Sequence, residues 1–362
     1  MKQRRDSLSH AARIEQRSAY LLVTPALLVV LVVAIYPLGS GLLKSFTDET
    51  FASDRAPAYV GLGNYSSLLG VAVRITKPLT DLATGAALTD SRTGAPKYPS
   101  PDDVLPRRPV RYSPLGEFSV LGTRVVVGAR DPAFILAILN SLAFTLITIS
   151  FEVTLGTLLA LLLQRRFRGR GALRAIMLVP WAIPTVISSR MWAWMFASTR
   201  AGFFNVILQC AGIGNGQIPF LEIKGWQLPI MCMIDIWKTT PFMTLLVLAG
   251  LQLIPLELYE AAEVDGVTRT RRFWRITLPL LRQTLAVALV FRTLDALRVF
   301  DLFQIVLGES RYSMASYTYY QLIQNRAAGY SAASGVIIFL LIFGFAVLYT
   351  RILGFQAASQ QE

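Results

Sequence analysis

Long apolar runs alternate with short charged segments along most of this 362-residue chain. A hydrocarbon layer about 30 Å thick is crossed by roughly 20 predominantly apolar residues in a helix. Runs of that length predict six membrane-spanning helices, at residues 20–43, 134–163, 172–197, 228–251, 280–307 and 332–353. The pattern therefore predicts an all-α membrane protein. Prolines inside the runs are compatible with this because neighbouring helices can satisfy the carbonyls that a proline frees.

Composition agrees with that class. Hydrophobic residues make up 54% of the chain and charged residues only 16%, and the mean hydropathy is +0.50. These values exceed those of ordinary soluble domains. The net charge of +13 would suit nucleic acid, but no nucleic-acid-binding module is recognisable. We therefore expect no nucleic-acid partner and ascribe the basic residues to membrane topology.

The basic residues in short loops predict the orientation. Residues 1–19, 164–174 and 253–282 carry five Lys or Arg each, whereas residues 198–227 and 308–331 carry two each. Short loops rich in Lys and Arg stay in the cytoplasm. We expect a cytoplasmic N-terminal segment at 1–19, a first transmembrane segment at 20–46 and a cytoplasmic tail at 354–362, so that both termini lie inside the cell.

The long segment 47–133 then lies outside. Its ten basic and nine acidic residues nearly cancel, and long loops escape the charge rule. It is rich in Pro and Gly and becomes β-prone at 118–127, so we expect an enlarged, partly β external loop or small cap. A docking surface for an external partner and a tolerated insertion both fit it. Residues 134–353 form a five-helix core that contains a cytoplasmic loop at 253–279.

Ionisable side chains inside the predicted spans indicate a polar interior, since such groups usually face a cavity or a partner. They are Glu152, Arg190, Asp235, Lys238, Arg292, Asp295 and Arg298. At a rise of about 1.5 Å per residue, depth predicts pairs of Asp235 with Arg298 and of Lys238 with Asp295. Pairing along the fifth span, through positions three apart, is the alternative. Glu152 has no assigned partner.

The cytoplasmic segment 256–272 has the features of a helix outside the membrane. Acidic residues come early and arginines late, which complements the helix dipole. The presence of Gly266 within this predicted helix has to be explained, because a glycine inside a helix lowers its stability by about 1 kcal/mol relative to alanine. Close approach of another surface is one reason, and a break between two short helices is another.

A longer pattern narrows the function. Glu260-Ala-Ala, then Gly266, then nine residues and Ile276-x-Leu-Pro279 resembles the EAA motif of permease subunits in binding-protein-dependent ABC importers. Tyr59-Val-Gly-Leu-Gly-Asn-Tyr65, Asn140-Ser-Leu and the segment 235–242 resemble further elements of that family. The nearest relatives are the carbohydrate permeases of the maltose, trehalose and glycerol-3-phosphate type, and the resemblance covers most of the chain outside 71–131.

The resemblance implies a coupling helix seated in a cleft of a cytoplasmic ATPase. The coupling residues would be Glu260, Ala261, Ala262, Asp265, Gly266 and Arg269. It also implies a second permease subunit, a dimer of ATP-binding subunits that binds ATP and Mg, an extracytoplasmic sugar-binding protein, a sugar substrate and the cytoplasmic membrane of a prokaryote. The chain itself would bind no cofactor, since it has no phosphate-binding loop of its own.

In the family, the fourth and fifth spans line the sugar pathway. The matching positions here are Asp235, Trp237, Lys238, Thr239, Phe242, Arg292, Asp295, Ala296, Arg298 and Val299. Charged and apolar residues stand where maltose-type permeases have amides and small polar side chains. Asp235 and Arg292 either contact the sugar directly or form ion pairs that have only a structural role.

Two other classes of protein compete with an importer permease. An ion-coupled secondary transporter of small polar solutes would not need the charged inner-loop motif. A membrane enzyme lacks support, because no HExxH or GxSxG motif is present. A Cys/His metal site is also excluded, since Cys210, Cys232 and His10 are the only residues of those types.

Overall fold

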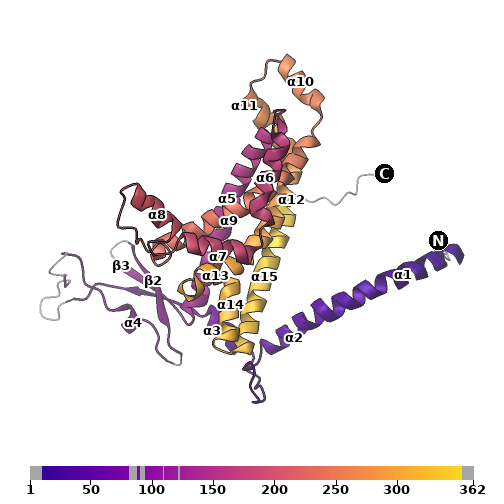
Figure 1. Cartoon of the computed structure of the whole chain (residues 1–362). Coiled ribbons are helices and arrows are strands. Elements are labelled where there is room, and N and C mark those ends of the chain that lie inside the picture. Colours follow the sequence, from indigo (N-terminus) through magenta and orange to yellow (C-terminus); the bar gives the residue numbers. More distant parts are fainter. Residues whose placement is uncertain (1–9, 81–87, 90–93, 109, 121–122, 353–362) are drawn as a thin grey trace. The chain divides into compact units, whose positions relative to one another are not determined.

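The computed structural model describes residues 10–80, 88–89, 94–108, 110–120 and 123–352. They form a mostly helical protein with one small sheet (Figure 1). Two compact units are distinguished, residues 1–65 with 321–336 and residues 66–320 with 337–362. Each is described by itself below.

The first unit contains a long apolar helix. It consists of α1 (His10–Val30), a π-helical turn (Leu31–Ile35) and α2 (Tyr36–Lys44). Its stretch Gln16–Lys44 is long and apolar enough to cross a membrane, and none of that span's apolar window is buried. A helix that is apolar all round and buries nothing within its own chain is suited to lipid or to another subunit.

The segment after this helix folds back on its end. The Asn64 side-chain amide donates hydrogen bonds to the carbonyls of Ser45 and Thr47, each at 2.9 Å. The Tyr65 and Ser45 hydroxyls lie 2.6 Å apart. Asn64 and Tyr65 therefore satisfy backbone and side-chain groups at the helix terminus, which would otherwise lack partners.

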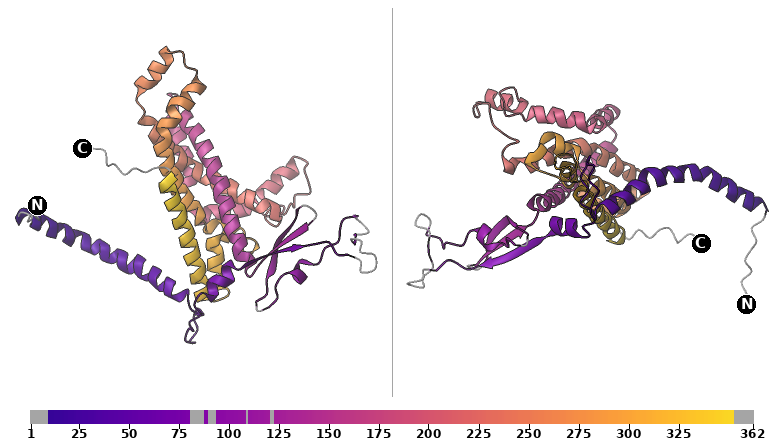
Figure 2. Two further views of the ribbon diagram at one scale, coloured as in Figure 1. Left: turned by 180° about the vertical axis from the view of Figure 1, so that it is seen from behind. Right: turned by 90° about the horizontal axis from the view of Figure 1, so that it is seen from below.

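The second unit begins with a three-stranded antiparallel sheet in the order β1-β3-β2 (Figure 2). Its elements, with the two short helices around it, are α3 (Gly63–Leu69), β1 (Val71–Thr76), α4 (Pro101–Val104), β2 (Ser113–Val120) and β3 (Thr123–Ala129). Val71 pairs with Ala129, and the Arg130 amide donates to the Gly70 carbonyl at 2.8 Å. The predicted β-content of residues 47–133 is confirmed, and the two ends of the sheet region meet.

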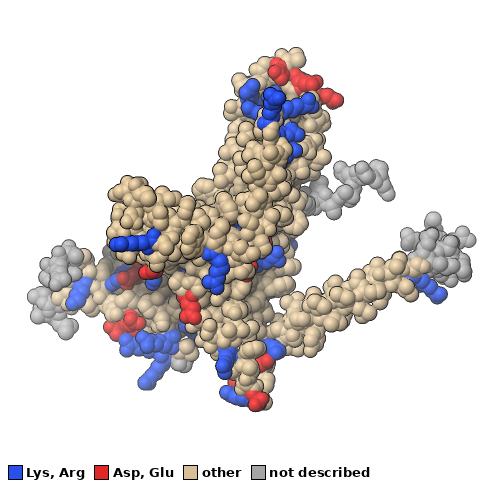
Figure 3. All heavy atoms as spheres, viewed as in Figure 1, with Lys and Arg blue, Asp and Glu red and all other residues tan. Residues whose placement is uncertain are grey.

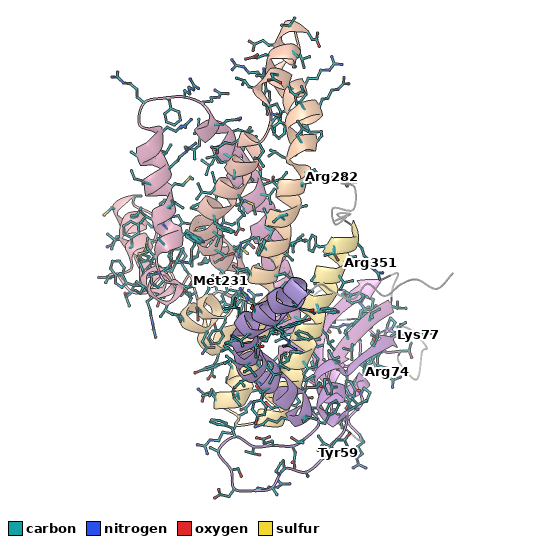
Figure 4. The ribbon with its side chains drawn as sticks, turned by 90° about the vertical axis from the view of Figure 1, so that its right-hand side faces the viewer. Tyr59, Arg74, Lys77, Met231, Arg282 and Arg351 are labelled. Atoms are coloured by element: carbon teal, nitrogen blue, oxygen red, sulfur yellow. The ribbon has the colours of Figure 1, made fainter. Side chains whose placement is uncertain are left out.

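Three long helices form the core of this unit: α5 (Pro132–Gln164), α9 (Lys224–Gln252) and α12 (Leu278–Leu297). Asp131 caps α5 by accepting from the Phe134 amide at 3.0 Å. Gly156 lets α5 approach α9 closely, because a Cβ there would lie 2.7 Å from Met243 Cγ. Met231 of α9 lies inside the bundle, whereas Arg282 of α12 is exposed (Figure 4).

Shorter elements surround the core. They are α6 (Arg170–Ala182), α7 (Thr185–Met195), α8 (Phe203–Cys210), α10 (Leu256–Val264), α11 (Arg269–Arg272), a π-helical turn (Phe273–Thr277), α13 (Asp301–Val306) and a 3-10 turn (Gly308–Ser310). α14 (Met314–Ile323) and the long α15 (Ala328–Ile352) are each divided between the two units.

Four helices among the described residues are long and apolar enough to span a membrane, or five if one bent pair counts as a span. They are Gln16–Lys44, Pro132–Gln164, Lys224–Gln252 and Ala328–Arg351, and the bent pair is α6 with α7. α12 falls short of this criterion because Arg282, Arg292 and Asp295 lie within its 20 residues. Leu353, the predicted last residue of the sixth span, lies outside the described residues.

Two predicted spans need correction. The run 172–197 is not one straight helix, since α6 and α7 meet at 88°. Pro184 explains the break, because it disfavours helical geometry at Ile183, which is extended with ψ 129°. The run 280–307 also breaks: α12 ends at Leu297, and α13 starts separately at Asp301.

Candidate functional site

A polar cavity of about 260 Å³ opens among α7, α9, α12 and α13. Eight of the ten predicted pathway residues line it: Asp235, Lys238, Thr239, Arg292, Asp295, Ala296, Arg298 and Val299. Thr185, Ser188, Ser189 and Asp301 add further polar groups to its wall. The fold thus gathers into one cavity residues that lie more than 50 positions apart in the sequence.

Arg292 is the centre of a buried ion network. Its Nε donates to Glu152 Oε2 at 2.6 Å and its Nη2 to Glu152 Oε1 at 3.0 Å. Nη2 also contacts the Asp235 carboxylate, and Nη1 donates to Asp295 Oδ2 at 2.8 Å. Glu152 is completely buried and Arg292 is 3% exposed. Three helices, α5, α9 and α12, are therefore joined through one guanidinium.

The depth-based pairs are wrong. Asp235 pairs with Arg292 and not with Arg298, and the Lys238 ammonium donates to the Ile183 carbonyl at 2.5 Å instead of to Asp295. α12 ends at Leu297, so depth counted to Arg298 along one continuous helix was misplaced. The alternative of pairing along the fifth span alone is correct only in part: Asp295 binds both Arg292 and Arg298, the latter at 3.3 Å, but Arg292 also binds Asp235 of α9.

Two predicted pathway residues do not line the cavity. Trp237 packs edge-on against Trp192, with ring centroids 5.3 Å apart. Phe242 stacks on Trp181 at 5.7 Å. Both rings lie in aromatic contacts, where they pack helices α6, α7 and α9 together.

Glu152, Ser188 and Ser189 were missed as site residues. A carboxylate in the middle of an apolar run must find a partner, but the sequence does not say which one. Thr239 donates to Glu152 Oε1 at 2.5 Å and so links it to the cavity wall. The Ser188 and Ser189 hydroxyls are buried and have no hydrogen-bond partner among the described residues. Both residues line the cavity, but their hydroxyl oxygens are buried behind its surface and do not themselves face a ligand.

The second candidate region is the loop that joins α9 to α12. α10 ends at Val264 and has Asp265 as its C-cap; after it the Gly266 amide donates to the Glu263 carbonyl at 3.1 Å and the Val267 amide to that of Ala262 at 2.9 Å. This pair of bonds defines a Schellman motif, whose glycine adopts a left-handed conformation. Gly266 has φ +67° and no atom of the chain lies within 4 Å of where its Cβ would be.

The single helix predicted over 256–272 is therefore wrong, and the break at Gly266 is confirmed. The physical reason for the glycine is its backbone conformation, because L-residues are disfavoured at positive φ. After the break, Thr268 caps α11 by accepting from the Arg271 amide at 3.4 Å.

Tyr259 anchors the loop to the start of α12. The Arg272 guanidinium lies over its ring at 5.5 Å, and its hydroxyl lies 3.1 Å from that of Thr277, just before α12. Ala262 is buried against this framework. The remaining predicted coupling residues are exposed: Glu260, Ala261, Asp265, Gly266 and Arg269. Figure 3 shows acidic and basic side chains gathered at this end of the bundle.

A groove of about 1190 Å³ separates the loop from the end of α5. Glu260 and Arg269 line it from the loop, and Arg165 lines it from the α5 side. The Arg174 guanidinium donates to the Leu163 carbonyl at 3.2 Å, which satisfies the terminus of α5. This end of the bundle therefore combines a rigid helix terminus with an exposed, charged loop.

The Asn140-Ser141 pair ties α5 to the segment between α13 and α14. Asn140 donates to the Tyr312 carbonyl at 2.9 Å and accepts from Arg311 Nε at 3.0 Å. The Ser141 hydroxyl accepts from the Met314 amide at 2.9 Å. These contacts hold the segment at the start of α5, at the end opposite the charged loop.

Comparison with known proteins places these features in a family. The family model described as "Binding-protein-dependent transport system inner membrane component" matches residues 152–354, which include both the ion network and the charged loop. The trehalose/maltose transport system permease protein MalF of Thermococcus litoralis is 41% identical over 233 residues, covering 63% of this chain and 76% of that protein.

The trehalose transport system permease protein SugA of Mycobacterium tuberculosis is 29% identical over 342 residues, covering 94% of this chain and 90% of that protein. Among solved structures, a chain of the bacterial alginate ABC transporter in complex with alginate pentasaccharide-bound periplasmic protein matches with a TM-score of 0.56 and 29% identity. The match covers 61% of this chain and 78% of that chain.

Proposed function

The chain belongs to the family of binding-protein-dependent transport system inner membrane components, and we propose that it is the permease subunit that carries a sugar across the cytoplasmic membrane of a prokaryotic cell. Membership makes it a multi-pass inner-membrane protein of an ABC importer, served by an external binding protein and by a separate ATPase. The chain is a transport subunit and not the ATPase.

The observation that carries the proposal is the geometry of the loop from Leu256 to Thr277. Its exposed residues Glu260, Asp265 and Arg269 stand on a short helix pair held to α12 through Tyr259. A charged loop that is anchored at its base and exposed at its tip is suited to transmit the movement of a soluble partner. We assign it the role of the coupling helix, seated in the cleft of the ATPase.

The assembly that we propose has four kinds of component: this chain, a second permease, ATP-binding subunits and a sugar-binding protein. A second, similar permease completes the sugar pathway, and a dimer of ATP-binding subunits binds ATP and Mg. α12 is the further span that completes six. Residues 1–19 and 354–362 face the cytoplasm and residues 47–133 face outward. The five cytoplasmic arginines of 164–174 support this orientation.

The sugar assignment is supported by two observations. The relatives above are named for trehalose, maltose or alginate transport. The cavity wall holds the carboxylates of Asp235 and Asp295 beside the hydroxyl of Thr239. Hydroxyl and carboxylate groups are the donors and acceptors that match a polyhydroxylated solute. We propose that the sugar passes through this cavity by alternating access.

The energy source tests the proposed function. In proteoliposomes that contain the complete importer and its binding protein, we expect trehalose or maltose uptake to require ATP at the ATPase side. A protonophore should leave the initial rate unchanged, because the driving energy comes from ATP hydrolysis and not from an ion gradient. Radiolabelled sugar measures uptake.

An empty-vesicle control and an ATPase variant without hydrolysis set the background of this experiment. Uptake that persists without ATP and collapses with the proton gradient would contradict the proposal and identify a secondary transporter instead.

A further inference from the structure

The charged side chains that line the cavity have no net formal charge, and one further carboxylate is buried behind them. Three acidic and three basic side chains line it: Asp235, Asp295, Asp301, Lys238, Arg292 and Arg298. Their formal charges cancel. Glu152 lies directly behind Arg292 and contributes one further negative charge without reaching the cavity surface, since it is completely buried. A single buried carboxylate therefore decides the sign of the charge at this site.

Glu152 also occupies the groups of Arg292 that bind anions best. An arginine has five N–H donors in a fixed fork, and a bidentate contact with a carboxylate or phosphate uses two of them. Glu152 takes such a bidentate contact through Nε and Nη2. Asp235 and Asp295 take one further donor each. Four of the five donors are then used by this chain, and no complete fork is left for a ligand.

The remaining cations of the wall are also engaged. Arg298 binds the Asp295 carboxylate at 3.3 Å, and Lys238 binds the Ile183 carbonyl at 2.5 Å. A solute with a phosphate, sulfonate or carboxylate group would have to displace the Ile183 carbonyl from Lys238. The Arg298 side chain is 71% exposed and is tied to the network only through Asp295. Such a solute would also meet the net negative charge that Glu152 adds behind the cavity wall.

We propose that Glu152 is a positioning residue that sets selectivity, because it holds Arg292 in a complete ion pair and so makes the cavity accept neutral saccharides and reject anionic ones. The inference rests on the proposed sugar pathway and deepens it by naming the chemical class of the sugar. Glu152 acts through Arg292 and does not touch the solute.

The test measures binding to the assembled permease–ATPase complex in nanodiscs, without nucleotide and without the binding protein, so that only the permease selects. The probes are two matched pairs: trehalose with trehalose 6-phosphate, and maltose with maltose 1-phosphate. Equilibrium dialysis at one fixed, low salt concentration gives the ratio of the two affinities in each pair.

The wild-type complex should bind the neutral sugar at least about tenfold more tightly than its phosphate. Glu152→Gln keeps the size of the side chain but removes its charge, and should narrow the ratio by about tenfold, chiefly through tighter binding of the phosphate. A purely structural role would weaken both probes together and leave the ratio unchanged.

Glu309→Gln is the charge-matched control. It is the same substitution at an exposed position outside the cavity, so the ratio should stay at the wild-type value. Asp295→Asn is a second test variant for the case in which Glu152→Gln fails to assemble. It removes one negative charge from the same network at a side chain that is 55% exposed, and should shift the ratio in the same direction.

The outcomes separate the inference from the function on which it rests. If neutral sugars bind but neither Glu152→Gln nor Asp295→Asn moves the ratio, selectivity by charge is refuted and the sugar pathway stands. If the wild-type phosphate binds as tightly as its neutral partner, the inference fails in the same way. If no neutral sugar binds the wild-type complex, the cavity is not a sugar site, and both proposals fall.

Discussion

At the scale of single residues, Gly266 and Arg292 are each unexpected in their sequence context: a glycine in a helix-prone segment and an arginine in an apolar run. Different physical requirements explain the two residues. Gly266 is required by a left-handed backbone at the end of α10, where no neighbour is close. Arg292 is required by its partners, because an uncompensated carboxylate at the position of Glu152 would be buried at a cost of several kcal/mol. The first requirement is local, whereas the second depends on three helices.

Substitution of Gly266 should therefore act through the backbone. Gly266→Val places a β-branched residue at φ +67° and should cost the loop roughly 1–2 kcal/mol, which misplaces Glu260 and Asp265. We expect sugar uptake to fall while ATP hydrolysis continues. Transport and phosphate release are measured on the same proteoliposomes, and membrane insertion should stay intact.

Gly266→Asn is the matched control for this prediction, because asparagine adopts left-handed backbone more readily than valine. It should retain most of the coupling. Equal, undiminished uptake in both variants would remove the coupling role from the loop.

At the scale of elements, the break between α6 and α7 places the cavity wall. Pro184 ends one helix and starts the next at 88°, and the turn brings Ser188 and Ser189 to the cavity. A break inside the membrane leaves backbone groups without helical partners, and these are satisfied only by protein or water. Lys238 fills this role, since it donates to the Ile183 carbonyl.

Loss of this donor should destabilise the break. Lys238→Met removes the charged hydrogen bond at Ile183, and we expect a loss of roughly 1–3 kcal/mol of stability. A thermal-unfolding scan of the purified complex in detergent should show a lower transition temperature than the wild type.

Lys238→Arg retains a donor on a long side chain and should lie closer to the wild type. A transition temperature for Lys238→Met at or above the wild-type value would show that the Ile183 carbonyl does not need this donor.

At the scale of the whole molecule, the sheet of β1, β2 and β3 is an insertion between α3 and α5. Its ends are joined by the hydrogen bond from Arg130 to Gly70. The sheet region contains buried apolar side chains of its own, since Val126 and Leu105 are buried and a Cβ at Gly128 would lie 2.5 Å from Leu105. Insertions with adjacent ends are tolerated well by the fold that carries them.

Removal of the insertion tests this independence. We expect replacement of residues 71–129 by a short Gly-Ser linker to leave membrane insertion and assembly with the ATPase intact, because the bundle of α5, α9 and α12 keeps its own contacts. Basal ATP hydrolysis by the purified complex measures assembly.

The stimulation of that hydrolysis by the sugar-loaded binding protein distinguishes the two roles left open for the segment. Loss of stimulation alone would identify a docking surface, and full stimulation would identify a tolerated insertion. Failure of the shortened chain to insert would contradict its structural independence.

Much of the fold could be predicted from the sequence, and so could the position of the charged loop after α9. Most of the predicted pathway residues line the cavity. The apolar runs predicted α5, α9 and α15, since a helix long and apolar enough to span a membrane is recognised from its own consecutive residues. The loop after α9 was recognised because its motif is local and is tied to one backbone conformation at Gly266. The β-prone run 118–127 likewise predicted strands from its own composition.

Only the tertiary structure decided the ion network. Charge and helical depth paired Asp235 with Arg298, but the ending of α12 at Leu297 and the burial of Glu152 gave Arg292 both Glu152 and Asp235 instead. The sequence by itself determined that charges lie among the apolar runs and that the loop after α9 is charged and contains a glycine that a continuous helix would disfavour. Which charge meets which depends on how helices far apart in the chain pack, and that is a property of three-dimensional distance and not of spacing along the chain.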